Sequence, residues 1–393
     1  MRTFFLFILQ LIFTVVSFAQ DIRVQSHLSD FSFDSVLVNV KQLSGELPVT
    51  VNGNAIYISS RLYNDIGNEQ TFQWVKENFS RFGLEIDSMA FSTNGKNLFG
   101  IKYGDIFPER VCILGAHYDN LPTGGIAPGA DDNASGTAVV LEAARILSNH
   151  QFPNTVIFAL WDEEELGLFG STAFANNFNI STDSLLGYIN LDMIAWDGNF
   201  DDRSEIHVRP IANSLHLANI ADKANLDYDI GLNLEIVNPG SSNTDHAPFW
   251  LNNLSAIGIS EEYQGDFNPF WHTLGDTLGN FNVPYYERNA RLAVSTFATL
   301  AYNKSGNQTM NEIINNAILF PNPSENNLLI EFSSAVTVNT TIEITNIYGE
   351  IIYKSSVVNF DLINLNFSNY PSGIYFINLT APGINKIFKM EKI

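Results

Sequence analysis

Four consecutive acids at residues 162–165 follow directly after an apolar run at residues 156–161. An apolar run this short predicts a buried strand, because a helix needs more residues. Carboxylates at the end of such a strand lie at the carboxyl edge of a sheet, where α/β proteins usually bind ligands. There they could hold a cation or take a proton. The alternative interpretation is a solvated acidic loop, since acids also suit the N-terminus of a following helix.

The other candidates for chemistry are acids and histidines that follow a short apolar run or a glycine-rich loop. They are His117, Asp119, Asp131, Asp192 and His272. The apolar runs before them cover residues 111–115, 187–191 and 256–260, and the glycine-rich loop covers residues 121–129. Taken singly, an aspartate before a helix, such as Asp132, is more often a cap, and a histidine after a strand is more often an ordinary polar residue. Four further histidines keep that ordinary interpretation, namely His27, His150, His207 and His216.

Taken together, the candidate side chains predict a metal centre. The ends of parallel strands converge in a doubly wound sheet, although the residues are far apart in the sequence. Imidazole and carboxylate are zinc ligands, and a chain with one cysteine offers no thiolate set. Two histidines and several carboxylates could hold two ions that share one carboxylate, about 3.5–4 Å apart in hydrolytic sites. The sequence has no His-Glu-x-x-His helix, no Gly-x-Ser-x-Gly elbow and no phosphate-binding loop.

The elements expected to position these residues alternate between strands and helices from residue 111 onward. Residues 205–208 form a possible further strand, and residues 134–147 and 285–302 have helical spacing. Residues 56–84 predict a longer helical region before the first of these strands. The alternation favours an α/β fold, with a mainly parallel mixed sheet flanked by helices.

Composition argues against some classes of partner. The chain of 393 residues has 20 basic and 42 acidic side chains, which gives a net charge of −22. This charge argues against nucleic acid and anionic membranes as partners. The single cysteine, Cys112, lies inside an apolar run, so we expect a buried thiol and no intramolecular disulfide.

The two ends of the chain differ from its middle. Residues 1–19 combine an early Arg2, an apolar stretch and small residues at the end, which predicts a secretory signal peptide. No other apolar stretch approaches the roughly 20 residues of a membrane helix. We place a polar linker at residues 304–317, and the short β-type runs of residues 318–393 predict a small all-β sandwich.

The motifs resemble those of the secreted di-zinc aminopeptidases, the bacterial leucyl aminopeptidase type of zinc exopeptidase. GAHYDN, APGADDNASG, WDEEELGLFGS, INLDMI and FWHTLGDT occur in the order that the family has. The resemblance covers about residues 35–303, inside a domain that we place at residues 20–303. It implies the zinc exopeptidase fold.

The resemblance also implies roles for individual residues. The implied zinc ligands are His117 and Asp192 for one ion, Glu165 and His272 for the other, and Asp131 as the bridge. Asp119 would orient His117, Glu164 would act as the general base toward a water between the two ions, and Tyr263 is a candidate oxyanion donor. We interpret Asp162 and Glu163 as solvated acids.

One further motif resembles the family only in part. Asp245 and His246 match it, and we interpret them as structural or substrate-lining residues. Just before them, Ser241, Ser242 and Asn243 stand where some relatives carry aromatic and cysteine residues. This departure leaves the preferred N-terminal residue of the substrate open.

The implied function is hydrolysis of the N-terminal peptide bond of peptides that have a free N-terminus, with two Zn²⁺ per chain. One alternative is a glutaminyl cyclase on the same fold, which uses one zinc ion. Another is a binding module without catalysis. The complete set of ligands disfavours the first alternative, and Glu164 disfavours the second.

The tail resembles the C-terminal sorting domain of type IX secretion. FPNPSENNLLIEF, YPSGIYFINL and KIFKMEKI carry this resemblance. It implies recognition by the secretion machinery, passage across the outer membrane and an extracellular or cell-surface location. An ordinary carbohydrate-binding or adhesive β-module is the alternative.

Overall fold

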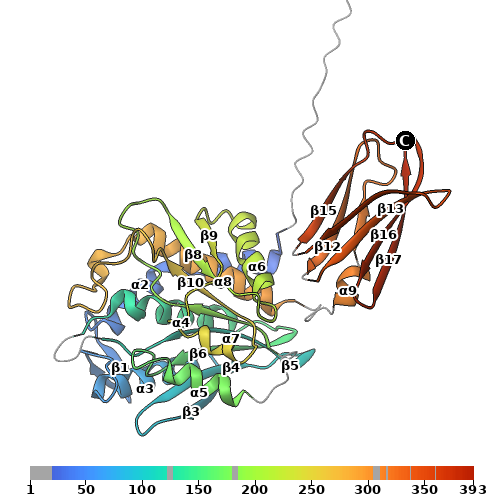
Figure 1. Ribbon diagram of the computed structural model, residues 1–393. Helices are drawn as coiled ribbons and strands as arrows, with labels where there is room; N and C mark the ends of the chain where they lie inside the picture. Colours follow the sequence, from blue (N-terminus) through green and yellow to red (C-terminus); the bar gives the residue numbers. More distant parts are fainter. Residues whose placement is uncertain are drawn as a thin grey trace, which may run out of the picture.

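The computed structural model describes residues 20–121, 127–178, 185–303, 310–315, 317–336, 338–358 and 360–393. The expected signal peptide, residues 1–19, lies outside the described residues, as do residues 304–309 of the expected linker. Figure 1 shows an α/β part, coloured from blue to orange, and a group of red antiparallel strands that leads to the C-terminus.

An eight-stranded mixed sheet forms the centre of the α/β part, in the order β3-β4-β6-β5-β7-β10-β8-β9. Its strands are β3 (Glu85–Ala90), β4 (Lys96–Lys102), β5 (Phe107–His117), β6 (Asn154–Trp161), β7 (Leu185–Leu191), β8 (Arg203–His207), β9 (Asn233–Val237) and β10 (Ala256–Glu261). β5 pairs in parallel with β6 and β7, and β7 pairs in parallel with β10. β4 runs antiparallel to both its neighbours, and β8 runs antiparallel to β10. The predicted α/β fold with a mainly parallel mixed sheet is confirmed.

Helices cover both faces of this sheet (Figure 1). They are α1 (Ile22–Asp30), α2 (Phe33–Leu43), α3 (Ile66–Arg81), α4 (Gly136–Leu147), α5 (Phe169–Asn177), α6 (Ser214–Asp227), α7 (Ala247–Leu251) and α8 (Val283–Ala301). Alternate residues of β5 point to opposite faces, as strand geometry requires. Cys112 and Leu114 join the larger core with α4 and α8, whereas Val111 and Ile113 join the smaller core with α5 and α7. The expected burial of the Cys112 thiol is confirmed.

The helix expected over residues 56–84 is shorter in the structure. A small hairpin, β1 (Val49–Val51) with β2 (Asn54–Ile56), comes first, and α3 begins only at Ile66. The segment between β2 and α3 is not helical, and the buried guanidinium of Arg61 stabilises its conformation. This group donates hydrogen bonds to four backbone carbonyls, those of Leu43, Tyr118, Pro128 and Gly129. The spacing of apolar residues along the sequence cannot predict hydrogen bonds of this kind.

Three strands of this sheet, β3, β4 and β9, were also absent from the sequence prediction. β3 and β9 stand at opposite edges of the sheet, and most of their residues are exposed or half-buried. An edge strand covered on one face carries no continuous apolar run, so its sequence lacks the signal that marks the central strands.

The C-terminal part consists of two antiparallel sheets around a core of their own. The strands are β11 (Ile318–Phe320), β12 (Asn327–Val336), β13 (Thr340–Asn346), β14 (Ile351–Val357), β15 (Phe360–Asn366), β16 (Gly373–Ala381) and β17 (Ile384–Lys392). The short helix α9 (Met310–Asn315) falls within the linker expected at residues 304–317, and its Ile314 is buried in this core. Among the described residues, no helix combines the length and the apolar character needed to cross a bilayer.

Candidate metal centre

Three neighbouring parallel strands bring candidate residues to one edge of the sheet. In the β5–β6 register His117 is level with Trp161, the last residue before the four acids. In the β5–β7 register Gly115 is level with Asn190, so Asp192 comes level with the end of β5. The convergence expected from the sequence is therefore present at this edge.

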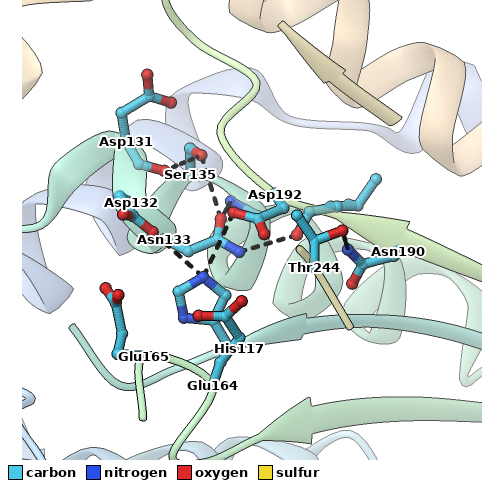
Figure 2. Close-up of polar contacts among 12 residues, drawn as sticks. His117, Asp131, Asp132, Asn133, Ser135, Glu164, Glu165, Asn190, Asp192 and Thr244 are labelled. Carbon is cyan, nitrogen blue, oxygen red and sulfur yellow. Dashed lines mark hydrogen bonds and ion pairs between the residues drawn. The ribbon is translucent and has the colours of Figure 1, made fainter. Parts of the chain in front are cut away.

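One carboxylate at this edge lies between two imidazoles. His117 Nε2 is 3.2 Å from Asp132 Oδ1 and 3.4 Å from Asp192 Oδ1, and Figure 2 shows both contacts. His272 Nε2 is 3.2 Å from Asp132 Oδ2 and 2.8 Å from Glu165 Oε2. The two oxygens of Asp132 thus face different histidines, which is the arrangement of a carboxylate shared by two cations.

The possible ligand atoms form two overlapping groups, each within 4.8 Å. The first group contains His117, Glu164 and Asp192, and the second contains His117, Asp132 and Glu165. Oxygen and nitrogen donors without sulfur suit zinc as well as harder divalent ions.

Asp131 does not join this cluster, which corrects the position expected for it. One of its oxygens accepts hydrogen bonds from the backbone N–H groups of Ile194 at 3.1 Å and Ala195 at 3.0 Å. The other accepts a hydrogen bond from Asn268 Nδ2 at 2.8 Å. In Figure 2 the Asp131 carboxylate points away from His117, whereas its neighbour Asp132 points toward it. The structure places Asp132, and not Asp131, between the two histidines.

Asp119 contacts His117 and the backbone of the two acids Glu164 and Glu165. Its Oδ1 lies 3.4 Å from His117 Nδ1, on the side of the ring away from the other acids. The same carboxylate accepts hydrogen bonds from the backbone N–H groups of Glu164 and Glu165, each at 3.2 Å. Asp119 therefore contacts one imidazole and the backbone of two acids at once.

The first two of the four consecutive acids have other partners. The Asp162 carboxylate accepts hydrogen bonds from Asn68 Nδ2 at 2.8 Å and the backbone N–H of Lys96 at 3.0 Å. Glu163 accepts a hydrogen bond from Ser92 Oγ at 2.8 Å. Both side chains are buried, so the expectation that they are solvated is wrong, although neither faces the cluster.

The electrostatics of the cluster call for a cation. Burial raises the pKa of Glu164 well above its usual range and raises the pKa of Glu165 to about 7. Burial opposes the charge on His272, but hydrogen bonds to Asp132 and Glu165 prevail and raise its pKa to about 10. The Oε1 atom of Glu165 is buried and has no hydrogen-bond partner in the described part of the chain. Four closely packed carboxylates, one with an orphaned oxygen, fit divalent metal ions well.

The protein stripped of metal is expected to lose thermal stability as the pH rises. The carboxyl of Glu165 has its folded pKa raised to about 7, so between about pH 4.5 and 7 the folded chain keeps a proton that the unfolded chain has released. The imidazole of His272, raised to about 10, acts in the same direction above pH 6.5. The midpoint of unfolding of the chelated protein should fall by on the order of 5 °C between pH 5 and pH 8.

The metal-loaded protein is the control for this measurement. Bound divalent ions replace the protons on these groups, so the midpoint of the loaded protein should fall less over the same range. An equal fall in both forms, followed by differential scanning fluorimetry, contradicts the assignment of the pH dependence to this cluster.

A cavity of about 550 Å³ opens onto the cluster. Part of its lining is apolar and aromatic, with Leu168, Met193, Phe267 and Trp271. Trp271 stacks on His272 at 3.8 Å between ring centroids. Another part consists of Ser241, Ser242, Asn243 and Thr244, which we call the polar wall. Tyr263 also lines the cavity, so its position is compatible with the oxyanion role suggested for it.

Comparison with known families identifies the α/β part. Residues 101–297 match the model of peptidase family M28. The chain belongs to this family. The M28 peptidase also carries a second match at residues 318–391, to the secretion system C-terminal sorting domain. A sorting domain of this kind indicates export to the cell surface or the exterior.

Relatives of the M28 peptidase agree with this assignment. Leupeptin-inactivating enzyme 1 of Streptomyces exfoliatus is 26% identical over 294 residues, which cover 68% of the chain and 62% of that relative. The LapA aminopeptidase of Legionella pneumophila superposes with a TM-score of 0.61 at 22% identity, over 72% of the chain and 76% of LapA. The glutaminyl cyclase of Porphyromonas gingivalis superposes with a TM-score of 0.56 at 18% identity, over 68% of the chain and 98% of the cyclase. At these identities the two structures show a shared fold.

Proposed function

We propose that the M28 peptidase is an aminopeptidase that uses two zinc ions. His117 and Asp192 would hold one ion, Glu165 and His272 the other, and Asp132 would bridge them in place of Asp131. The observation that carries this proposal is the position of the Asp132 carboxylate, with one oxygen toward each imidazole at 3.2 Å. Relatives named as aminopeptidases support the same conclusion.

The ions, when bound, would lower the pKa of a water molecule and polarise the carbonyl of the scissile peptide. The residues around them hold the ligands in place. Asp119 lies against His117 Nδ1 and leaves Nε2 directed at Asp132 and Asp192. A ligand histidine is commonly fixed by a carboxylate in this way.

Glu164 is the residue placed to move protons. It is grouped with His117 and Asp192 and also lines the cavity, so it can face the reacting water and the substrate together. A carboxylate in this position is a common general base toward a water molecule. We assign to Glu164 the removal of a proton from the water and its delivery to the departing amine.

Acidic residues that line the cavity would also bind the free α-amine of a peptide. These residues are Glu164, Glu165 and Asp192, and an ammonium group beside them is attracted by charge. Such attraction favours cleavage at the N-terminal residue over cleavage inside a chain. The sorting domain fits an enzyme that meets its peptides outside the cell, after passage across the outer membrane by the secretion machinery.

Metal content and product analysis test this proposal. The zinc-loaded protein should contain two zinc ions per chain by elemental analysis and should release free amino acids from dipeptides. A chelator should abolish the release, and added Zn²⁺ should restore it. An N-acetylated dipeptide is the matched control and should remain intact, because it lacks the ammonium group.

The same experiment separates the alternatives. One zinc ion per chain, together with conversion of N-terminal glutamine to a cyclised product, indicates a glutaminyl cyclase. Two zinc ions without any turnover indicate a binding module. Release of amino acids that resists chelation contradicts metal catalysis altogether.

A further inference from the structure

The polar wall is held by two buried histidines that the proposed mechanism does not use. His207 ends β8, and His246 precedes α7; both are almost completely buried. Their rings are stacked, with centroids 6.0 Å apart and planes inclined by 11°. Together they contact both backbone groups of a single residue, Ser241.

His207 accepts the backbone N–H of Ser241. The distance from Ser241 N to His207 Nδ1 is 3.1 Å, so Nδ1 must be unprotonated and the proton must sit on Nε2. Nε2 lies 3.1 Å from Glu205 Oε2 and 2.9 Å from Ser260 Oγ, and both can accept this proton. Ser260 donates its own hydroxyl proton to the carbonyl of Glu261, which leaves its oxygen free to accept. The tautomer of His207 is therefore fixed from both sides.

His246 binds the other backbone group of Ser241. Its Nε2 donates to the Ser241 carbonyl at 2.8 Å, while its Nδ1 accepts the hydroxyl of Thr244 at 2.7 Å. Thr244 accepts in turn from Asn190 Nδ2 at 3.3 Å. Burial lowers the pKa of His246 to about 3, so the ring stays neutral and keeps one donor and one acceptor.

Two glycines make room for this pair. A Cβ at Gly258 would lie 2.5 Å from the ring of His246. A Cβ at Gly240 would lie 2.6 Å from the backbone N of Val208 and 2.9 Å from the Cβ of His207. Gly258 lies close to the ring of His246, and Gly240 lies close to the backbone and Cβ of His207, so neither position has space for a side chain.

The polar wall needs such support because cavities lie on both sides of it. A second cavity of about 400 Å³ is lined by Glu205, His207 and Tyr263, and also by Ser241, Ser242 and Asn243, which line the first cavity. A segment that borders a cavity on each side is packed on fewer sides than one inside the core. The side chains of Ser242 and Asn243 are exposed, and no described residue forms a hydrogen bond with either of them.

We propose that His207 and His246 are positioning residues that fix Ser241, and that the polar wall held in this way selects side chains with hydrogen-bonding groups next to the scissile bond. The selection rests on the proposed peptidase function. The substrate class is peptides whose first or second residue carries a hydroxyl or amide, because Ser242 and Asn243 offer donors and acceptors that an aliphatic side chain leaves without a partner.

Matched peptide pairs test the selection. Thr and Val have nearly the same shape, as do Asn and Leu, and each pair can be placed first in an aminoacyl p-nitroanilide or second in a dipeptide. We expect kcat/KM of the wild type to favour Thr over Val and Asn over Leu by about tenfold at one of the two positions. A preference for Val and Leu at both positions overturns the proposal.

Paired variants test the positioning. His207→Asn keeps an oxygen near Nδ1 to accept the Ser241 N–H, and His246→Gln keeps an amide N–H near Nε2 to donate to the Ser241 carbonyl. His207→Leu and His246→Leu remove these bonds. For the leucine variants we expect KM to rise about tenfold with kcat within about threefold, and the Thr/Val and Asn/Leu ratios to fall toward one. The amide variants should retain the ratios of the wild type.

Hydrogen exchange gives a readout that does not depend on catalysis. The Ser241 amide should exchange about tenfold faster or more in His207→Leu than in the wild type, while amides of β5 and β7 stay protected. His27→Leu is the matched control, because His27 is buried against Tyr302 and lines neither cavity. Unchanged exchange at Ser241 and unchanged ratios in a folded leucine variant overturn the positioning role. A wild type without any hydrolysis overturns the proposed function and the selection with it, while exchange at Ser241 still decides the positioning role.

Discussion

Glu164→Gln is expected to lower kcat by about a thousandfold while two zinc ions remain bound to each chain. The amide of glutamine fills the space of the carboxylate but cannot take a proton from water. A loss of this size corresponds to about 4 kcal/mol of transition-state stabilisation. The hydrogen bond from the backbone N–H of residue 164 to Asp119 does not involve the side chain, so the loop should keep its course.

Two neighbouring substitutions serve as comparisons for Glu164→Gln. Glu163→Gln changes an acid that contacts Ser92 and does not line the cavity, so kcat should stay within about threefold of the wild type. Glu165→Gln changes an acid that contacts His272 at 2.8 Å, so it should lower the zinc content as well as kcat. Steady-state kinetics with elemental analysis of each variant distinguishes the three. If Glu164→Gln keeps a kcat within tenfold of the wild type, another group is the base.

The expected convergence of the candidate residues depended on signals that are local in the sequence. Each central strand is a short apolar run, and the end of the run marks the edge of the sheet. His117 and Asp192 lie within two residues of the ends of such runs, and the parallel register of β5 and β7 then brings them together. A strand buried on both faces carries this signal strongly because nearly all of its residues are apolar.

The residues that contact a side chain are often far from it in the sequence. The sequence was therefore insufficient to predict these contacts. Asp131 and Asp132 are adjacent acids with the same local pattern. What separates them is contact with residues far along the chain: Ile194, Ala195 and Asn268 bind the first, and two histidines flank the second. His207 was interpreted as an ordinary polar residue for the same reason. The position of His207 near the end of a possible strand was the one sequence signal that could have identified it as a candidate functional residue.

Asp132→Asn is therefore expected to remove activity through loss of metal, with zinc falling to one ion per chain or fewer. A carboxylate can coordinate two cations at once, one through each oxygen, whereas an asparagine offers a single neutral oxygen. We expect kcat/KM to fall by at least about 10³-fold at micromolar zinc. Equilibrium dialysis against buffered zinc, followed by elemental analysis, measures the loss directly.

Asp131→Asn is the matched comparison, because it makes the same change one residue earlier. The asparagine oxygen can still accept the N–H groups of Ile194 and Ala195, so both zinc ions should remain and kcat/KM should stay within about a hundredfold of the wild type. A drop in unfolding free energy of about 1–3 kcal/mol is expected instead, since the contact with Asn268 loses its acceptor. If Asp131→Asn loses zinc and Asp132→Asn keeps it, the assignment based on the sequence motif is right and the one based on the geometry is wrong. The pair thus tests whether hydrogen-bond partners identify a shared ligand better than its position in a motif.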